Sequence, residues 1–262
     1  WGYPFAFATS SGRQGLELLL QSLGPEVPRR AYVPAYTIEA VPERFARAGF
    51  ETVFVDIDPE TLSVGPREVR AAYRGPGLLL VTHYFGLPAD MEALVPLCGE
   101  LGLAVLEDCA HAPGGTCGGR AVGRFGAGGF LSFETRKPLN GLGGGMVVVE
   151  DPALAACIES RLAGAAESRL QDARKLAMTT AEWLALQPPW FDLVAPMLHR
   201  ETGRRGLVSV YRRWHGASRA PDRAFSNLQA SLVLDQLPGF AASTDQRRAL
   251  AAIYDAGLPA SA

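Results

Sequence analysis

The stretch Leu103-Ala-Val-Leu-Glu-Asp108, followed directly by Cys109-Ala-His111, is the part of the chain that says most about its fold. It is an apolar run of strand length that ends in two carboxylates, and an imidazole follows three residues after Asp108. In open parallel sheets, ligands gather outside the carboxyl ends of the strands. The pattern therefore predicts a buried strand whose last residues face a ligand site.

Similar apolar runs recur up to about residue 150 and alternate with segments of helical period. This rhythm is typical of βαβ units and predicts an α/β fold of three layers, with helices on both faces of a mostly parallel sheet. The expected helices run from Gly12 to Leu23, Glu39 to Arg47 and Ala89 to Gly99. The six expected strands are Arg30–Pro34, Glu51–Asp56, Leu78–His83, Leu103–Asp108, Gly129–Phe133 and Gly145–Glu150.

The second part of the chain has a different character. Residues from Pro152 to about Trp190 are rich in Ala and Arg with helical spacing, and Gln187-Pro-Pro-Trp190 interrupts them. A loop-rich, basic stretch is expected from His199 to Arg223, and an amphipathic helix from Ser226 to Leu237. No repeat or low-complexity linker divides the chain into two complete domains.

Composition narrows the class of protein. A chain of 262 residues with 48% hydrophobic content can bury a sizeable core. The net charge of −2, with Lys and Arg scattered along the chain, gives no basic face of the kind that nucleic acid binding needs, which argues against nucleic acid as a partner. Four scattered cysteines indicate reduced thiols. No apolar run is long enough to cross a bilayer, so we expect a soluble, cytoplasmic protein without a membrane partner.

Lys137 follows one of the expected strands and precedes a glycine-rich segment, Gly141-Leu-Gly-Gly-Gly145. A lysine held beside Arg136 and partly removed from water would have a lowered amine pKa, which favours Schiff-base chemistry. The alternative is a solvated charge beside a tight loop.

Near the start of the chain, Ser11-Gly-Arg-Gln-Gly15 opens an expected helix. Unpaired amides at such a helix start bind phosphate, and Arg13 adds a positive charge. An ordinary Ser N-cap explains the same residues equally well. Asp108 and His111 likewise have a simpler interpretation, as a local cap and a hydrogen-bonded histidine.

Together these features resemble the DegT/DnrJ/EryC1/StrS family of sugar aminotransferases, over about residues 8 to 150. The resemblance implies the fold-type-I large domain with a seven-stranded sheet, pyridoxal 5'-phosphate (PLP) as cofactor and a homodimer with sites at the subunit interface. Its motifs are Ser11-Gly12, Val33-Pro-Ala-Tyr-Thr37, Val53-Phe-Val-Asp-Ile-Asp58, His83-Tyr-Phe-Gly-Leu-Pro-Ala-Asp90, Glu107-Asp-Cys-Ala-His111, Gly119-Arg-Ala-Val-Gly123 and Ser132-Phe-x-x-x-Lys137.

The resemblance also implies residue roles. Lys137 matches the lysine that forms the internal aldimine with PLP and moves the proton. Asp108 would pair with the pyridine nitrogen, His111 would lie against the ring, and Ser132 would contact the cofactor. Gly12, Arg13 and Gln14 fall at the phosphate-binding turn.

Some positions depart from the family pattern. Ile38 stands where many members have an aromatic residue on the cofactor. Ala224, with Arg223 beside it, takes the place of an Asn or Arg that reaches into the partner's site. By length, residues 1–239 would be the large domain, with a helical extension over about 152–239, and residues 240–262 the start of an incomplete small domain.

The function that the resemblance implies is transfer of an amino group, with glutamate as donor, to a nucleotide-linked keto-sugar. A non-catalytic relative with a binding or regulatory role is the alternative, as is a PLP-dependent sugar dehydratase, although Lys137 replaces the histidine of those enzymes. A dinucleotide site lacks its fingerprint after the first strand. Zinc binding by Cys109, His111 and Cys117 lacks a fourth ligand, so no metal is expected.

Overall fold

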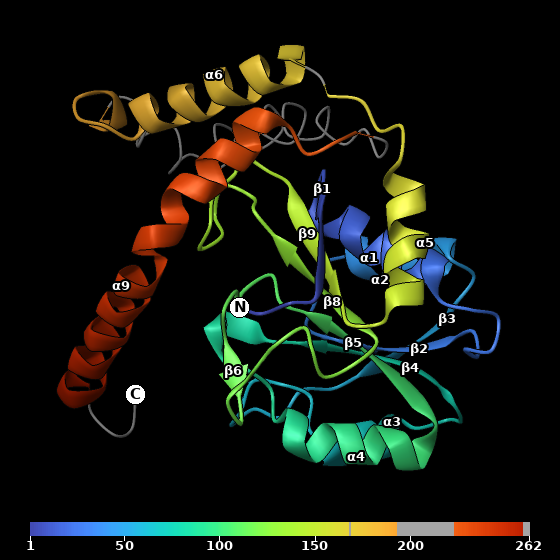
Figure 1. The fold of residues 1–262 in the computed structure, drawn as a ribbon. Coiled ribbons are helices and arrows are strands. Elements are labelled where there is room, and N and C mark those ends of the chain that lie inside the picture. Colours follow the sequence, from blue (N-terminus) through green and yellow to red (C-terminus); the bar gives the residue numbers. More distant parts are fainter. Residues whose placement is uncertain (168, 193–222, 259–262) are drawn as a thin grey trace, which may run out of the picture.

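The computed structural model describes residues 1–167, 169–192 and 223–258 (Figure 1). The described residues form one seven-stranded sheet with the strand order β1-β9-β8-β5-β4-β2-β3. Neighbours from β3 to β8 are parallel, whereas β9 is antiparallel to both β8 and β1. The expected mostly parallel α/β fold is therefore confirmed. The strands are β1 Phe5–Thr9, β2 Arg30–Pro34, β3 Glu51–Val55, β4 Gly77–Thr82, β5 Leu103–Asp108, β8 Gly128–Ser132 and β9 Gly145–Val149, and β6 Thr116–Cys117 pairs with β7 Arg120–Ala121 in a separate ribbon.

Helices cover both faces of the sheet (Figure 1). Helices α1 (Gly12–Ser22), α2 (Ala40–Arg47) and α5 (Pro152–Leu162) pack on one face, and α3 (Pro66–Ala72) and α4 (Met91–Leu101) on the other. Strand β4 shows why the layers form. Leu78 and Leu80 lie in the core under α1, α2 and α5, whereas Leu79 and Val81 lie in a second core under α3 and α4. This continuous apolar run is therefore buried on both sides.

Strand β1, helix α3 and the short ribbon of β6 and β7 were not among the elements expected from the sequence. Strand β1 alternates Phe5 and Phe7, which are partly buried, with exposed alanines, and it pairs only with β9 at the sheet edge. Alanine is a weak strand former, and the β-strand pattern is short. Helix α3 is seven residues long and begins at Pro66 after the N-cap Gly65.

The later helices extend beyond their expected limits. Residues Pro152 to Trp190 contain α5 and then α6 (Arg169–Ala185). Helix α9 begins after Ser226, as expected, but continues to Gly257, through Pro238. The domain boundary expected near residue 239 falls within α9 and stays a prediction. The basic stretch expected from residue 199 lies outside the described residues, apart from Arg223.

A third core forms where the first turns of α9 meet the sheet. Leu131, Phe133 and Val148 pack there with Val233 of α9 and with Phe225 just before it. None of the helices described has both the length and the apolar character needed to span a membrane.

Candidate functional site

The carboxyl ends of β5 and β8 lie side by side, because these two parallel strands pair with Asp108 opposite Phe130. Asp108 is the last residue of β5 and Ser132 the last of β8. His111 and Lys137 follow these two strand ends in the connecting loops. The fold therefore brings together, at the carboxyl ends of two strands, the pair Asp108 and His111 and the pair Ser132 and Lys137, which are separated in the sequence.

Neighbouring residues of a strand point to opposite faces of the sheet, and this separates Asp108 from Glu107. Leu106 lies in the core under α1 and α5, so Asp108, two residues later, faces the same side as Phe130 and Ser132. Glu107 points to the opposite side, where it is completely buried. The two adjacent carboxylates therefore belong to different environments.

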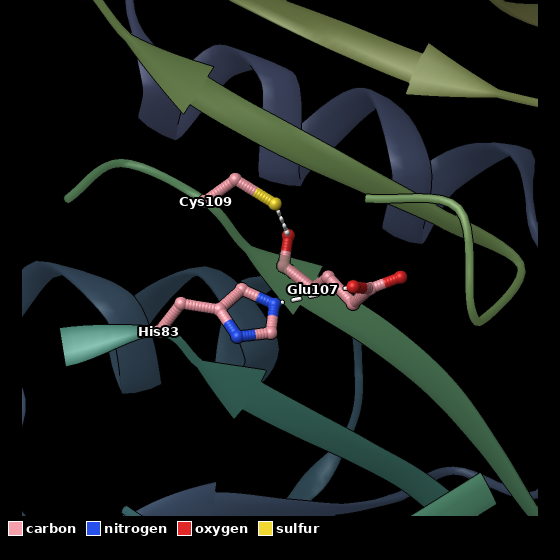
Figure 2. A group of neighbouring side chains, drawn as sticks. All are labelled: His83, Glu107 and Cys109. Atoms are coloured by element: carbon pink, nitrogen blue, oxygen red, sulfur yellow. Dashed lines mark hydrogen bonds and ion pairs between the residues drawn. The ribbon is translucent and has the colours of Figure 1, made fainter. Parts of the chain in front are cut away.

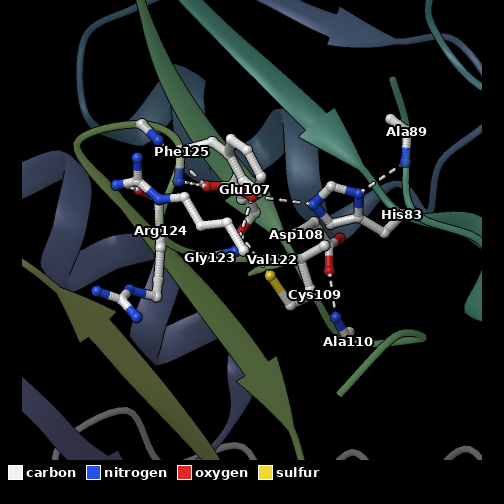
Figure 3. Close-up of polar contacts among 12 residues, drawn as sticks. His83, Ala89, Glu107, Asp108, Cys109, Ala110, Val122, Gly123, Arg124 and Phe125 are labelled. Carbon is white, nitrogen blue, oxygen red and sulfur yellow. Dashed lines mark hydrogen bonds and ion pairs between the residues drawn. The ribbon is translucent and has the colours of Figure 1, made fainter. Parts of the chain in front are cut away.

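Glu107 is held by hydrogen bonds on both oxygens (Figure 3). Its Oε2 accepts from the amide of Gly123 at 2.7 Å and lies 3.1 Å from His83 Nε2. Its Oε1 accepts from the amides of Phe125 at 2.7 Å and Gly126 at 3.2 Å. Four donors satisfy this buried carboxylate and tie the end of β5 to the loop before β8.

The hydrogen bonds of His83 assign its tautomer. Its Nδ1 accepts from the amide of Ala89 at 3.0 Å, so the proton must lie on Nε2, which donates to Glu107 (Figure 3). His83, like Glu107, has no exposed surface. This pair connects the segment after β4 to the end of β5.

His83, Glu107 and Cys109 are the one group within the described residues that could hold a metal ion, with ligand atoms within 4.8 Å of one another (Figure 2). This is not the set of Cys109, His111 and Cys117 considered from the sequence. Both ring nitrogens of His83 and both oxygens of Glu107 already have hydrogen-bond partners. A metal would displace these bonds, so the geometry favours a structural cluster.

Asp108 combines a local and a longer-range role. Its Oδ1 accepts from the amide of Ala110 at 2.9 Å, which is the local cap considered from the sequence. Burial raises the pKa of Asp108, while the Ala110 amide and the charges of Lys137 and His111 oppose that increase. The carboxylate is therefore close enough to both side chains to interact with them electrostatically.

Lys137 lies in the turn after β8, where its amide donates to the Glu134 carbonyl at 2.8 Å. Burial lowers the pKa of its amine, and the negative charges of Asp108 and Glu134 oppose this decrease. A lowered pKa of the Lys137 amine was expected from the sequence, with Arg136 as a cause beside burial. Burial is the main cause, and it increases the fraction of neutral, nucleophilic amine.

His111 lies near the charged side chains of Asp108 and Lys137 and also near an aromatic cluster that contains Tyr84 and Phe85. Burial lowers its pKa, Lys137 lowers it further, and Asp108 raises it. Its ring is 6.4 Å from that of Tyr84 and 6.5 Å from that of Phe85. Phe85 has φ of +56°, an uncommon conformation for a bulky residue and one that concentrates at functional sites.

Ile38 is connected to this cluster only through its neighbours. It lies after β2 with 62% of its surface exposed. The ring of Tyr36, two residues earlier, packs 5.4 Å from Tyr84 and 6.3 Å from Phe85. The segment that carries Ile38 is therefore fixed near His111.

The start of α1 packs against the end of β8. A Cβ on Gly12 would lie 3.1 Å from both the Ser132 Cβ and the Leu131 carbonyl, so glycine permits this approach. Ser11 is the N-cap of α1, and its Oγ accepts from the Gln14 amide at 3.1 Å. The simpler N-cap interpretation is therefore confirmed.

The same cap leaves the helix start suited to an anion. Gln14 helps to close the turn, because its Oε1 accepts from the Ser10 amide at 2.6 Å. Gly12 and Arg13 occupy the first turn of the helix, where the helix dipole favours negative charge. Ser132 is brought to this turn from the neighbouring strand.

Residues 1–183 match the family model described as the DegT/DnrJ/EryC1/StrS aminotransferase family. The chain belongs to this family. The match covers the sheet and both flanking layers, so the fold is that of the large domain of these PLP-dependent transferases.

Three similar proteins illustrate the likeness. The pleiotropic regulatory protein of Geobacillus stearothermophilus is 36% identical over 147 residues, which are 55% of this chain and 40% of that protein. An aminotransferase from Psychrobacter cryohalolentis has 30% identity and a TM-score of 0.58 over 61% of this chain and 41% of its own. DesI, solved with its TDP-sugar product, has 33% identity and a TM-score of 0.56 over 62% and 41%. The chain spans less than half the length of each.

The donor set fits the PLP of this DegT/DnrJ/EryC1/StrS fold. An amine with a lowered pKa (Lys137), a carboxylate that interacts with it (Asp108) and an imidazole beside both (His111) share one sheet edge. The start of α1 and Ser132 supply a place for a phosphate group.

His83 and Phe85 were given no role from the sequence, because their contacts arise from tertiary packing. Both stand in a motif that the family resemblance included. The one signal for Phe85 was the following Gly86, which indicates a turn after β4. The pairing of His83 with Glu107 joins residues 24 apart and has no local signature.

Proposed function

We propose that this chain carries the cofactor site of a PLP-dependent aminotransferase that acts on a nucleotide-linked keto-sugar. The observation that supports this most directly is the meeting of Asp108, His111 and Lys137, whose charges shift one another's pKa at the ends of β5 and β8. Perturbed pKa values of this kind concentrate at catalytic sites. Family membership supports the same reaction class.

In this proposal Lys137 is the covalent anchor and the proton carrier. Its lowered pKa favours the neutral amine, which is the form that attacks a carbonyl carbon. Glu134 and Asp108 oppose that decrease and would keep the amine able to take up a proton again. PLP, when bound, supplies an electron sink for the substrate carbon.

In this proposal the other site residues would bind PLP and orient it. Asp108 would accept a hydrogen bond from the pyridine nitrogen, and His111 would lie against the ring. Gly12, Arg13 and Gln14, together with Ser132, would bind the phosphate. Ile38 would give aliphatic contact beside the aromatic cluster.

The proposal also covers the substrate class, the amino donor and the oligomeric state. DesI was solved with a TDP-sugar product, which supports a nucleotide sugar as the substrate class. By family resemblance we propose glutamate as amino donor, a homodimer, a cytoplasmic setting and residues 1–239 as the large domain.

The test is the visible spectrum of the purified protein after addition of PLP, followed by borohydride reduction and peptide mapping. The sequence contains two lysines, Lys137 and Lys175, so the labelled peptide decides between them. A reducible absorption band with the label on Lys137 is expected. A label on Lys175, or on no lysine, would reject Lys137 as the anchor.

A second candidate is a regulatory relative without catalysis. It is favoured by the pleiotropic regulatory protein, which is 36% identical over 147 residues. The spectrum alone does not separate the two, because a regulator can retain PLP. Conversion of the bound cofactor on addition of glutamate distinguishes them, since a non-catalytic protein leaves the band unchanged.

A further inference from the structure

Two distant segments meet over the glycine-rich loop that follows Lys137. A Cβ built on Gly143 would lie 3.4 Å from Lys175 Nζ, which comes from α6, and 3.7 Å from Gln229 Nε2, which comes from α9. The ring of Phe225 packs against Gly144. Figure 1 shows α6 and the first turns of α9 at the same end of the sheet. The loop is thus covered by residues more than 30 positions away in the sequence.

Arg223 stands at the start of the covering segment. A β-bridge joins it to Ala166, and the amide of Ala224 donates to the Ala166 carbonyl at 3.3 Å. The buried Nη1 of Arg223 has no hydrogen-bond partner within the part of the chain that the structure describes. A buried donor without an acceptor is costly, and a ligand that accepts hydrogen bonds removes that cost.

Lys175 and Arg223 are close enough to repel each other. Burial lowers the pKa of the Lys175 amine and Arg223 lowers it further, while Asp172 on the same helix opposes the decrease. Gln229, the other polar group beside Gly143, uses its Nε2 to donate to the Gly141 carbonyl at 3.1 Å. Two cationic side chains, Lys175 and Arg223, therefore meet near a single carboxylate, Asp172, and this excess of positive charge favours an anion.

Both lysines of the chain lie near the glycine-rich loop. Of the 25 basic residues, 23 are arginine, and the two lysines are Lys137 and Lys175. Lys137 stands four residues before Gly141, and Lys175 lies over Gly143. A lysine amine is a compact charge with three donors, and arginine adds a planar fork that matches phosphate. Lys175 and Arg223 together therefore offer both kinds of contact.

We propose that Lys175 and Arg223 bind a phosphate group of a ligand beside the glycine-rich loop, in the same chain that carries Lys137. Two adjacent cations match the two negative charges of a phosphate monoester, or of the diphosphate in a nucleotide sugar, better than the single charge of a carboxylate. By the family resemblance, Ala224 and Arg223 stand where other members have an Asn or Arg that reaches into the partner's site. Here Arg223 is placed beside Lys175 of its own chain.

Two ligands could supply the phosphate, namely PLP itself and the diphosphate of a nucleotide sugar. The start of α1 beside Ser132 already offers one phosphate site, formed by different residues. We therefore expect the Lys175 and Arg223 site to take the diphosphate. This choice rests on the proposed function, whereas the phosphate site itself does not.

The test is a calorimetric titration with inorganic pyrophosphate in the absence of PLP. Lys175→Gln and Arg223→Gln are each expected to weaken pyrophosphate binding about 10-fold or more, because each removes one charged hydrogen-bond donor. Lys175→Arg, which keeps the charge, should retain most of the affinity. Arg174→Gln is the matched control, since Arg174 is the exposed neighbour on the same helix, and should change affinity less than about 2-fold. Thermal melting of each variant checks the fold.

The outcomes separate the possible sources. Unchanged PLP affinity in Lys175→Gln assigns the site to the diphosphate, whereas an equal loss of PLP affinity assigns it to the cofactor. The proposal is overturned if the wild-type protein does not bind pyrophosphate, or if Arg174→Gln weakens binding as much as Lys175→Gln. Pyrophosphate binding does not involve Lys137, so this test can fail while the aminotransferase proposal stands.

Discussion

His83 Nε2 lies 3.1 Å from Glu107 Oε2, and neither side chain is exposed to solvent. The backbone amides of Gly123, Phe125 and Gly126 complete the partners of this carboxylate. The pair fixes the end of β5, so that Asp108, the next residue, is presented from a rigid strand. Glu107 thus supports the candidate site from the opposite face of the sheet.

Replacing Glu107 should therefore lower the stability of the fold, because Glu107 holds the strand end and does not face the candidate site. Glu107→Gln places an amide donor among groups that are already donors, and we expect the free energy of unfolding to fall by about 2–4 kcal/mol. Urea unfolding followed by circular dichroism measures this. Glu51→Gln is the control, because Glu51 forms an exposed ion pair with Arg30 and should cost less than about 1 kcal/mol. Equal effects of the two substitutions would contradict a structural role for Glu107.

Asp108→Asn should leave the fold largely intact and change the titration of Lys137. The negative charge of Asp108 raises the pKa of the Lys137 amine, so its removal should lower that pKa below its already lowered value. The neutral amine would then persist to lower pH. We expect the pH of half-maximal acylation of Lys137, followed by peptide mass spectrometry, to move downward, with Lys175 in the same sample as the internal reference. An unchanged pH of half-maximal acylation would place Asp108 outside the electrostatic reach of Lys137.

Lys137→Ala should abolish borohydride labelling and reduce amino-group transfer from glutamate to bound PLP by about 1,000-fold or more, because it removes the anchor and the proton carrier. The absorbance change on addition of glutamate measures the transfer. Lys137→Arg tests whether charge alone is sufficient, and it should lose as much activity. Transfer that survives in the alanine variant would remove Lys137 from the mechanism.

Gly12→Ala should weaken PLP binding, since the new Cβ would lie 3.1 Å from Ser132 and push α1 away from β8. We expect an affinity loss of about 10-fold and a stability loss of about 1–2 kcal/mol. Gly99→Ala provides the comparison, because a Cβ there meets no atom within 4 Å and sits in α4, where alanine favours the helix. Spectroscopic titration with PLP and thermal melting measure both effects. A Gly12 variant that binds PLP like the Gly99 variant would argue against the phosphate turn.

Local patterns in the sequence were sufficient for much of the fold. The apolar runs within the expected strands Leu78–His83 and Leu103–Asp108 predicted the central strands, because strands buried on both faces are apolar over most of their length. Strand β1 escaped prediction, since its two phenylalanines are only half buried at the sheet edge. Helix α9 was ended too early at Leu237, before Pro238, yet it continues to Gly257.

By itself, the sequence determined the α/β class, the central strands, the family resemblance and the candidate residues at strand ends, because each depends on spacing along the chain. Only the tertiary structure decided that Glu107 and Asp108 face opposite sides of the sheet, that His83 is one of four hydrogen-bond donors to Glu107, and that Lys175 reaches the glycine-rich loop. These relationships join residues from separate elements. They depend on strand register, sheet order and helix placement, and spacing along the chain does not encode them in any local pattern.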